Sequence, residues 1–102
     1  MTKAQKLSDA ALEQAAGCLR TIAHPARLRM IEVLLDREAS VGELAQIVGI
    51  APNAATMHLR LLEHCGMLRR TRQGRGVFYS VVEPHLENIL ACVRARFAET
   101  TK

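Results

Sequence analysis

Glycine and proline divide residues 40–66 into two short helices that are separated by a turn of about three residues. Ser40 opens a capping box at the start of the first helix, and Gly49 ends that helix. Pro52 suits the first position of the second helix, and Gly66 follows its last residue. Two short helices joined in this way predict a helix-turn-helix over residues 40–65, with the second as the recognition helix.

A basic β-hairpin is predicted directly after the second helix, over residues 68–81, and is called the wing below. Residues 68–72 and 77–81 are rich in β-branched, aromatic and arginine residues, and they flank a loop at 73–76 that contains two glycines. Four arginines lie in this segment without an acid among them, namely Arg69, Arg70, Arg72 and Arg75. A helix that can enter a groove beside such a hairpin is typical of a DNA-reading winged helix.

The net charge of the chain is concentrated in the half that contains these two elements. Residues 1–51 hold six Lys or Arg and six Asp or Glu, whereas residues 52–102 hold eight and four, which gives the whole excess of +4. An arginine run elsewhere would be read as a solvated surface. Its position after a helix-turn-helix favours contact with phosphates.

The remaining segments predict three more helices in a single domain of 102 residues. Ser8 caps the first, His24 and Pro25 begin the second, and Pro84 opens the last. In the second helix Arg27 and Arg29 are expected to lean outward, and residues 36–39 are expected to form a polar connection. The last helix carries one apolar stripe, formed by Leu86, Ile89, Leu90, Val93 and Phe97. The predicted fold is mainly α with a two-stranded β-hairpin between the fourth and fifth helices.

Several classes of protein are disfavoured by the same sequence. No apolar run reaches the roughly 18 residues of a membrane span, and the N-terminus lacks the apolar core of a signal peptide, so a soluble cytoplasmic protein is expected. No grouping of acid, base and nucleophile suggests an enzyme. The alternative to a DNA-binding regulator is a winged-helix protein-interaction module that does not bind DNA. Such a module would not need four arginines on its wing.

Five separate motifs, in order and with matching gaps, resemble the ArsR/SmtB winged-helix repressors. They lie at residues 23–29, 40–45, 58–62, 65–68 and 76–80. The resemblance covers residues ~15–97 and implies a repressor that binds a palindromic operator as a homodimer, joined through helices at 8–22 and 84–98. It also implies release by a metal, metalloid or thiol-reactive signal. The apolar stripe of the last helix agrees independently, because such a face at a chain end needs a partner surface.

On the recognition helix, the outward positions near its start are the candidates for contact with bases in the major groove. They are Asn53, Thr56, Met57 and Arg60, while Ala55, Leu59 and Leu62 are expected to pack inward. Asn53 and Thr56 can hydrogen-bond base edges or phosphates, although both also fit ordinary polar positions on a helix surface. Met57 stands where the family often has a polar residue, and Ala51 replaces its usual serine cap. More apolar contact, for example with thymine methyl groups, is therefore expected.

On the wing, Arg75 at the tip is the candidate for insertion into the minor groove. Arg70 and Arg72 are expected to contact the flanking phosphates.

The cysteine pairs of three sensing subgroups of the family are missing or incomplete at the aligned positions. The thiolate metal site at the start of the third helix is replaced by Ser40 and Gly42. The persulfide-sensing pair is replaced by Glu32 and Ala98. A pair at the end of the recognition helix is half present, with Leu61 and Cys65.

A fourth site of the family lies on the last helix, and its aligned residues here are Glu83, His85, Arg96 and Glu99. Arginine cannot ligate a metal, but Cys92 projects within about 60° of His85 and Glu99 on an ideal helix. His85, Cys92 and Glu99 therefore form a candidate site for a zinc-like divalent ion. Two alternatives remain: a surface cluster around Arg96 that binds no metal, or an Arg96 that stabilises the thiolate of Cys92 and makes it reactive.

Three cysteines in an intracellular chain do not suggest a disulfide scaffold. Family geometry implies that Cys18 lies near the partner's last helix. Cys18 and Cys92, with or without Cys65, are thus candidates for thiol sensing, either by binding arsenite or by forming a redox disulfide. The alternative is that each is a small buried apolar residue. His24 and His64 are read as polar residues at helix ends.

Overall fold

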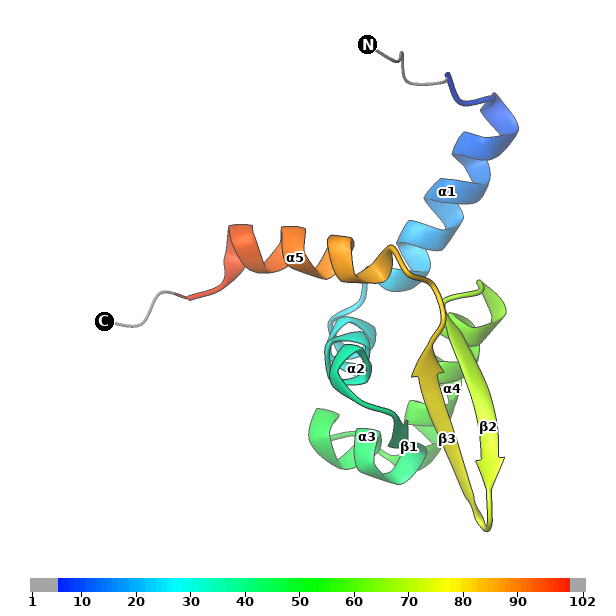
Figure 1. Ribbon diagram of the computed structural model, residues 1–102, viewed down its shortest axis with the longest axis vertical. Coiled ribbons are helices and arrows are strands. Elements are labelled where there is room, and N and C mark those ends of the chain that lie inside the picture. The colour runs from blue at the N-terminus through cyan, green and yellow to red at the C-terminus, as the bar shows by residue number, and fades with distance from the viewer. Residues whose placement is uncertain (1–5, 100–102) are drawn as a thin grey trace.

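A computed structural model describes residues 6–99 and shows five helices with a small sheet (Figure 1). The elements in order are α1 (Asp9–Ile22), α2 (Pro25–Asp36), β1 (Ala39–Ser40), α3 (Val41–Val48), α4 (Pro52–His64), β2 (Leu68–Gln73), β3 (Gly76–Val81) and α5 (Leu86–Phe97). The predicted winged helix-turn-helix is confirmed: α3 and α4 form the helix-turn-helix, and β2 and β3 form the wing. Within the described residues, no helix has the length and apolar character needed to span a membrane.

The sheet has one strand more than the hairpin that was predicted. β1 pairs antiparallel with β3, so the strand order is β1-β3-β2. Ala39, expected in a polar connection, is fully buried in this strand. The hairpin loop is also shorter than predicted, because the strands run to Gln73 and Gly76 and leave a two-residue turn. Gly74 occupies its first position with φ +59°, a left-handed conformation that favours glycine.

Most of the predicted helix boundaries are confirmed by capping hydrogen bonds. The Ser8 hydroxyl accepts from the Ala11 amide, and Ser40 and Glu43 form the reciprocal capping box. The last helix begins later than predicted, at Leu86. The His85 amide donates to the Glu83 carboxylate at 2.9 Å, and this hydrogen bond belongs to a turn before the helix.

The core lies where α2, α3 and α4 pack against one another and against the wing. Its buried apolar side chains include Met30, Ile31, Leu44, Leu59, Leu62, Tyr79 and Leu86. α1 and α5 project away from this body (Figure 1). The radius of gyration is accordingly 15.3 Å, against about 13 Å for a compact domain of 100 residues. Two helices are thus only partly covered within one chain.

Candidate DNA interface

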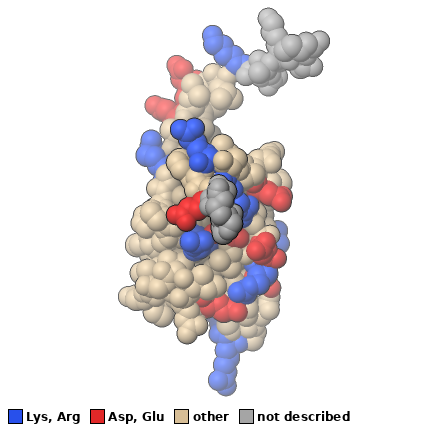
Figure 2. Space-filling view, turned by 90° about the vertical axis from the view of Figure 1, so that its left-hand side faces the viewer, with Lys and Arg blue, Asp and Glu red and all other residues tan. Residues whose placement is uncertain are grey.

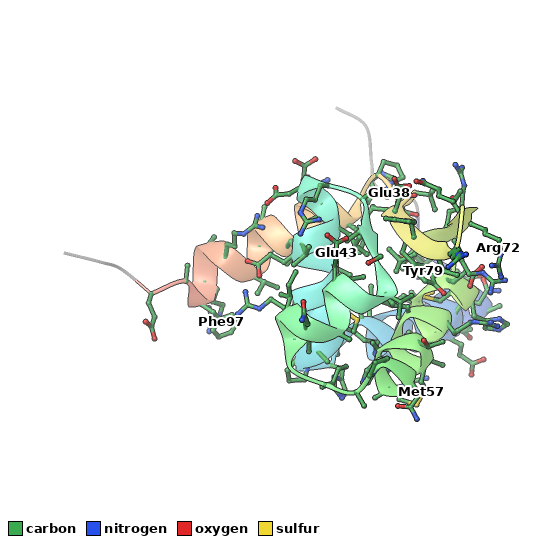
Figure 3. The ribbon with its side chains drawn as sticks, turned by 90° about the horizontal axis from the view of Figure 1, so that it is seen from below. Glu38, Glu43, Met57, Arg72, Tyr79 and Phe97 are labelled. Atoms are coloured by element: carbon green, nitrogen blue, oxygen red, sulfur yellow. The ribbon has the colours of Figure 1, made fainter. Side chains whose placement is uncertain are left out.

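The recognition helix α4 buries one side and exposes the other. Ala55, Leu59 and Leu62 are fully buried, as predicted. On the opposite side Asn53 and Arg60 are exposed, and Met57 is 53% exposed and points away from the core (Figure 3). The exposed face bears two polar side chains and one flexible apolar side chain, a combination that suits base edges and thymine methyl groups.

Thr56 is less available than its neighbours on α4. It is half-buried, and its hydroxyl donates to the Pro52 carbonyl oxygen at 3.0 Å. The hydroxyl oxygen keeps its capacity to accept a hydrogen bond. The Thr56 side chain therefore leaves an acceptor oxygen and a methyl group available at the surface.

The start of α4 has little capping of its own. Ala51 stands at the N-cap and contributes no side-chain hydrogen bond, and Pro52 follows at the first position. The turn before it is set by Gly49, whose φ of +81° ends α3 in the left-handed conformation. The exposed side chains of α4 therefore follow a helix start that is fixed by glycine and proline rather than by a polar cap.

An ion pair holds the wing against α4. The Arg70 guanidinium lies 3.8 Å from the Glu63 carboxylate. Tyr79, directly across the strand pair from Arg70, is buried between the wing and the helices (Figure 3). Burial and the Glu63 charge raise the pKa of the Tyr79 hydroxyl, whereas the charges of Arg70 and Arg60 counteract the rise. A buried aromatic ring and one partly exposed ion pair thus join the wing to the recognition helix.

The strand register places the wing arginines in two directions. Arg70 and Arg72 pair with Tyr79 and Val77 and so share the face of the wing that turns toward α4. Together with Val77 they line a hollow of about 290 Å³. Arg75 is exposed in the turn at the tip, and a basic projection extends from the lower end of the molecule (Figure 2). Two guanidinium groups, of Arg70 and Arg72, therefore lie beside α4, and that of Arg75 lies farther away at the tip of the wing.

A buried histidine on α4 was missed by sequence reasoning. His58 is only 8% exposed, and its Nδ1 accepts a hydrogen bond from the Arg27 guanidinium at 2.9 Å. The ring of His24 lies 4.7 Å from that of His58. The prediction that Arg27 leans outward is therefore wrong, because it bonds to His58, whereas Arg29 is exposed as predicted. A spacing of 31 residues between Arg27 and His58 gives no local signal of this pairing.

The candidate metal ligands of the last helix are not gathered within one chain. Among residues 6–99 no three His, Cys, Asp or Glu side chains are close enough to hold an ion. α5 ends at Phe97 and the backbone is extended at Ala98, so the projection of Glu99 onto the helical face of Cys92 is wrong. His85 and Cys92 are seven residues apart, about 10 Å along a helix. A site formed by His85, Cys92 and Glu99 would need ligands from a second chain and stays a prediction.

Two of the three cysteines lie together within one chain. The predicted approach of Cys18 to Cys92 runs between two chains and stays a prediction. Cys18 on α1 contacts Cys65 at the end of α4, and its thiol lies 3.9 Å from the Cys65 carbonyl oxygen. Cys92 is exposed on α5. No disulfide links the described cysteines, all three of which are free thiols.

The chain matches known proteins over most of its length. A helix-turn-helix domain model matches residues 22–71. The HTH-type transcriptional regulator Rv0081 of Mycobacterium tuberculosis is 36% identical over 80 residues, which is 78% of this chain and 70% of that protein. The transcriptional repressor PagR of Bacillus anthracis is 33% identical over 86 residues, 83% of this chain and 86% of PagR. The structure of NolR from Sinorhizobium fredii superposes with a TM-score of 0.82 at 29% identity, covering 95% of this chain and all of NolR. By their names, Rv0081 and PagR are regulators of transcription.

Proposed function

Since the chain belongs to the ArsR/SmtB class of helix-turn-helix transcriptional regulators, we propose that it is a cytoplasmic repressor that binds a palindromic DNA operator as a homodimer. One observation carries this proposal. The exposed face of α4 and the arginines of the wing lie next to each other, so one protomer can reach a major groove and the neighbouring phosphates together.

The recognition helix supplies the contacts that distinguish base pairs. Asn53 can bond bidentately to adenine, and Met57 offers an apolar surface to a thymine methyl group. Arg60 and the acceptor oxygen of Thr56 lie on the same exposed side, within reach of base edges or phosphate.

The wing supplies affinity that depends little on sequence. Arg70 and Arg72 face phosphates flanking the recognition helix, and Arg75 at the tip reaches the adjacent minor groove. Because Arg70 is also paired with Glu63 on α4, the wing already contacts the recognition helix in the free protein.

Dimerisation is supported by apolar surface that one chain leaves uncovered. On α1, Leu12 and Leu19 are 49% and 54% exposed, and Phe97 on α5 is 70% exposed (Figure 3). Leu12 and Leu19 are seven residues apart and share one face of α1. A second copy that covers both helices would place two recognition helices on one side of the assembly and so match a palindrome.

Selection from a random pool of duplex DNA tests this proposal. The purified, reduced protein is expected to enrich an inverted repeat whose half-sites lie about one helical turn apart. An enriched sequence with a single half-site would contradict the dimer. A pool that stays random through repeated rounds would contradict sequence-specific binding altogether.

A further inference from the structure

The thiols of Cys18 and Cys65 meet where α1 packs against the end of α4. The Cys18 Sγ donates to the Cys65 carbonyl oxygen at 3.9 Å. The residues are 47 positions apart in the chain, so only the folded packing of α1 on α4 brings them together. Both are partly exposed, which leaves room for a small reagent to approach.

We propose that Cys18 and Cys65 form a redox-active dithiol, and that its oxidation by a hydroperoxide to an intrachain disulfide weakens DNA binding. The redox chemistry stands on the contact between the two residues alone. The effect on DNA rests on the proposed function above.

The environment of the two thiols assigns them different roles. The Cys65 Sγ donates to the Leu62 carbonyl oxygen at 3.7 Å, and burial, followed by the neighbouring Cys18, raises the pKa of the Cys65 thiol. The Cys65 thiol is therefore the weaker nucleophile, and the first attack is assigned to Cys18. The Cys18 sulfur attacks the hydroperoxide, the O–O bond breaks, and an alcohol leaves after taking up a proton.

The second step closes the disulfide. The Cys65 sulfur attacks the sulfenic acid on Cys18, the S–O bond breaks, and water leaves with the proton of Cys65. In total, two thiols lose two electrons and two protons, while one hydroperoxide is reduced to an alcohol and water. Reduction by a dithiol reverses the change by exchange.

The position of Cys65 connects this chemistry to the recognition helix. Cys65 is the C-cap of α4, and its amide bonds to the Leu61 carbonyl oxygen. A disulfide fixes the two sulfurs about 2.05 Å apart, so oxidation draws the end of α4 toward α1. Because α1 carries part of the proposed dimer surface, a changed angle between α1 and α4 alters the distance between the two recognition helices. That distance must match one turn of DNA.

Peptide mapping of the full-length protein tests the chemistry without any substitution. Trypsin places the three cysteines on three different peptides, Leu7–Arg20, Leu61–Arg69 and Gly76–Arg94. After treatment with a small excess of hydrogen peroxide, the first two are expected to appear as one disulfide-linked species that separates on reduction. Three unlinked peptides, or links made mainly through Gly76–Arg94, would overturn the proposal.

Fluorescence anisotropy with the selected operator then tests the regulation. Oxidation is expected to lower the affinity of the wild type and of Cys92→Ser about tenfold, within the usual range of coupling between two sites. Cys18→Ser and Cys65→Ser, with folding checked by circular dichroism, are expected to keep their affinity under peroxide. A disulfide that leaves the affinity unchanged would overturn its regulatory role. Reduced protein that binds no DNA would instead refute the proposed function, while the peptide map still decides on the dithiol.

Discussion

The Arg27 guanidinium donates a hydrogen bond to Nδ1 of His58 at 2.9 Å and so joins α2 to the buried face of the recognition helix. The same guanidinium donates to the carbonyl oxygen of Thr21, near the end of α1. Since Nδ1 of His58 acts as an acceptor, the imidazole is neutral and carries its proton on Nε2. One arginine therefore links three helices, and this link depends on a histidine that stays unprotonated.

Stability is expected to fall as the pH falls below about 6.5. Burial, then the charges of Arg27 and His24, lower the pKa of His58 from its ordinary value of 6.5. The native state thus binds fewer protons than the unfolded chain between the lowered pKa and 6.5. The contribution of His58 is complete above that range and is lost as the pH decreases through it. Urea unfolding at several pH values between 5 and 8 measures how the free energy of unfolding depends on pH.

The variant His58→Asn isolates this contribution, because asparagine keeps an acceptor for Arg27 but does not titrate. Its free energy of unfolding should depend less on pH than that of the wild type. The two proteins share every other ionisable group, so the difference between their pH dependences reports on position 58. An equal pH dependence of the free energy of unfolding in the two proteins would show that His58 is not the cause of the loss of stability at low pH.

Loss of the arginine at the tip of the wing should weaken binding to all DNA sequences alike. Arg75→Ala is expected to reduce the dependence of log K on log salt by about 0.9, the value of one phosphate contact. Arg29→Ala serves as the control, because Arg29 is an exposed arginine of α2 that pairs with Glu32. Affinity measured between 50 and 200 mM salt checks both variants. An unchanged slope for Arg75→Ala would remove the wing tip from the DNA contacts.

A change on the recognition helix should instead affect individual base pairs. Asn53→Ala is expected to cost roughly 1–3 kcal/mol on the selected operator and to relax the preference at one position of each half-site. Met57→Gln should reduce the preference for thymine where the methyl group was read. Competition with operators that carry single base changes gives both values. An equal loss of affinity for all competitor sequences would mean that these side chains contact only the phosphate backbone of the DNA.

Truncating a side chain on the buried side of α4 should lower the stability of the protein, whereas truncating one on the exposed side should weaken DNA binding. Leu59→Ala removes a fully buried side chain and is expected to cost about 2–5 kcal/mol in the free energy of unfolding. Met57→Ala on the exposed side should change stability by less than about 0.5 kcal/mol while weakening DNA binding. Urea denaturation of the two variants provides the comparison. Similar losses of stability would contradict the orientation of the helix.

A charge placed on the uncovered face of α1 should separate the proposed dimer. Leu19→Glu is expected to give a monomer in light scattering after gel filtration, because it places a carboxylate in an apolar contact. Gln14→Glu adds the same charge to an exposed position of the same helix and should remain dimeric. A dimeric Leu19→Glu protein would place the interface elsewhere.

Local signals made most of the fold predictable. Serine, proline and glycine at helix ends act through hydrogen bonds and backbone angles within a few residues, and Ser40, Gly49 and Pro52 behave as expected. β1 was missed because two residues are too short to show a periodic pattern, and Ala39 is buried only through its pairing with Tyr79.

Contacts between residues far apart in the sequence could not be predicted in the same way. Cys18 meets Cys65 because α1 packs against α4, a contact that no spacing within the sequence specifies. For the same reason the pairing of Arg27 with His58 appears only in the folded chain. Helix geometry alone also failed at Glu99, since it assumed that α5 continues past Phe97.

The affinity of the reduced, metal-free protein for its selected operator and for a scrambled duplex is the most direct test of the account. Fluorescence anisotropy at several salt concentrations should show binding to the operator at least about 1,000-fold tighter than to the scrambled DNA. Affinity for both should decrease steeply with salt. Equal and weak binding to the two duplexes would contradict the account and favour a winged helix that binds another protein.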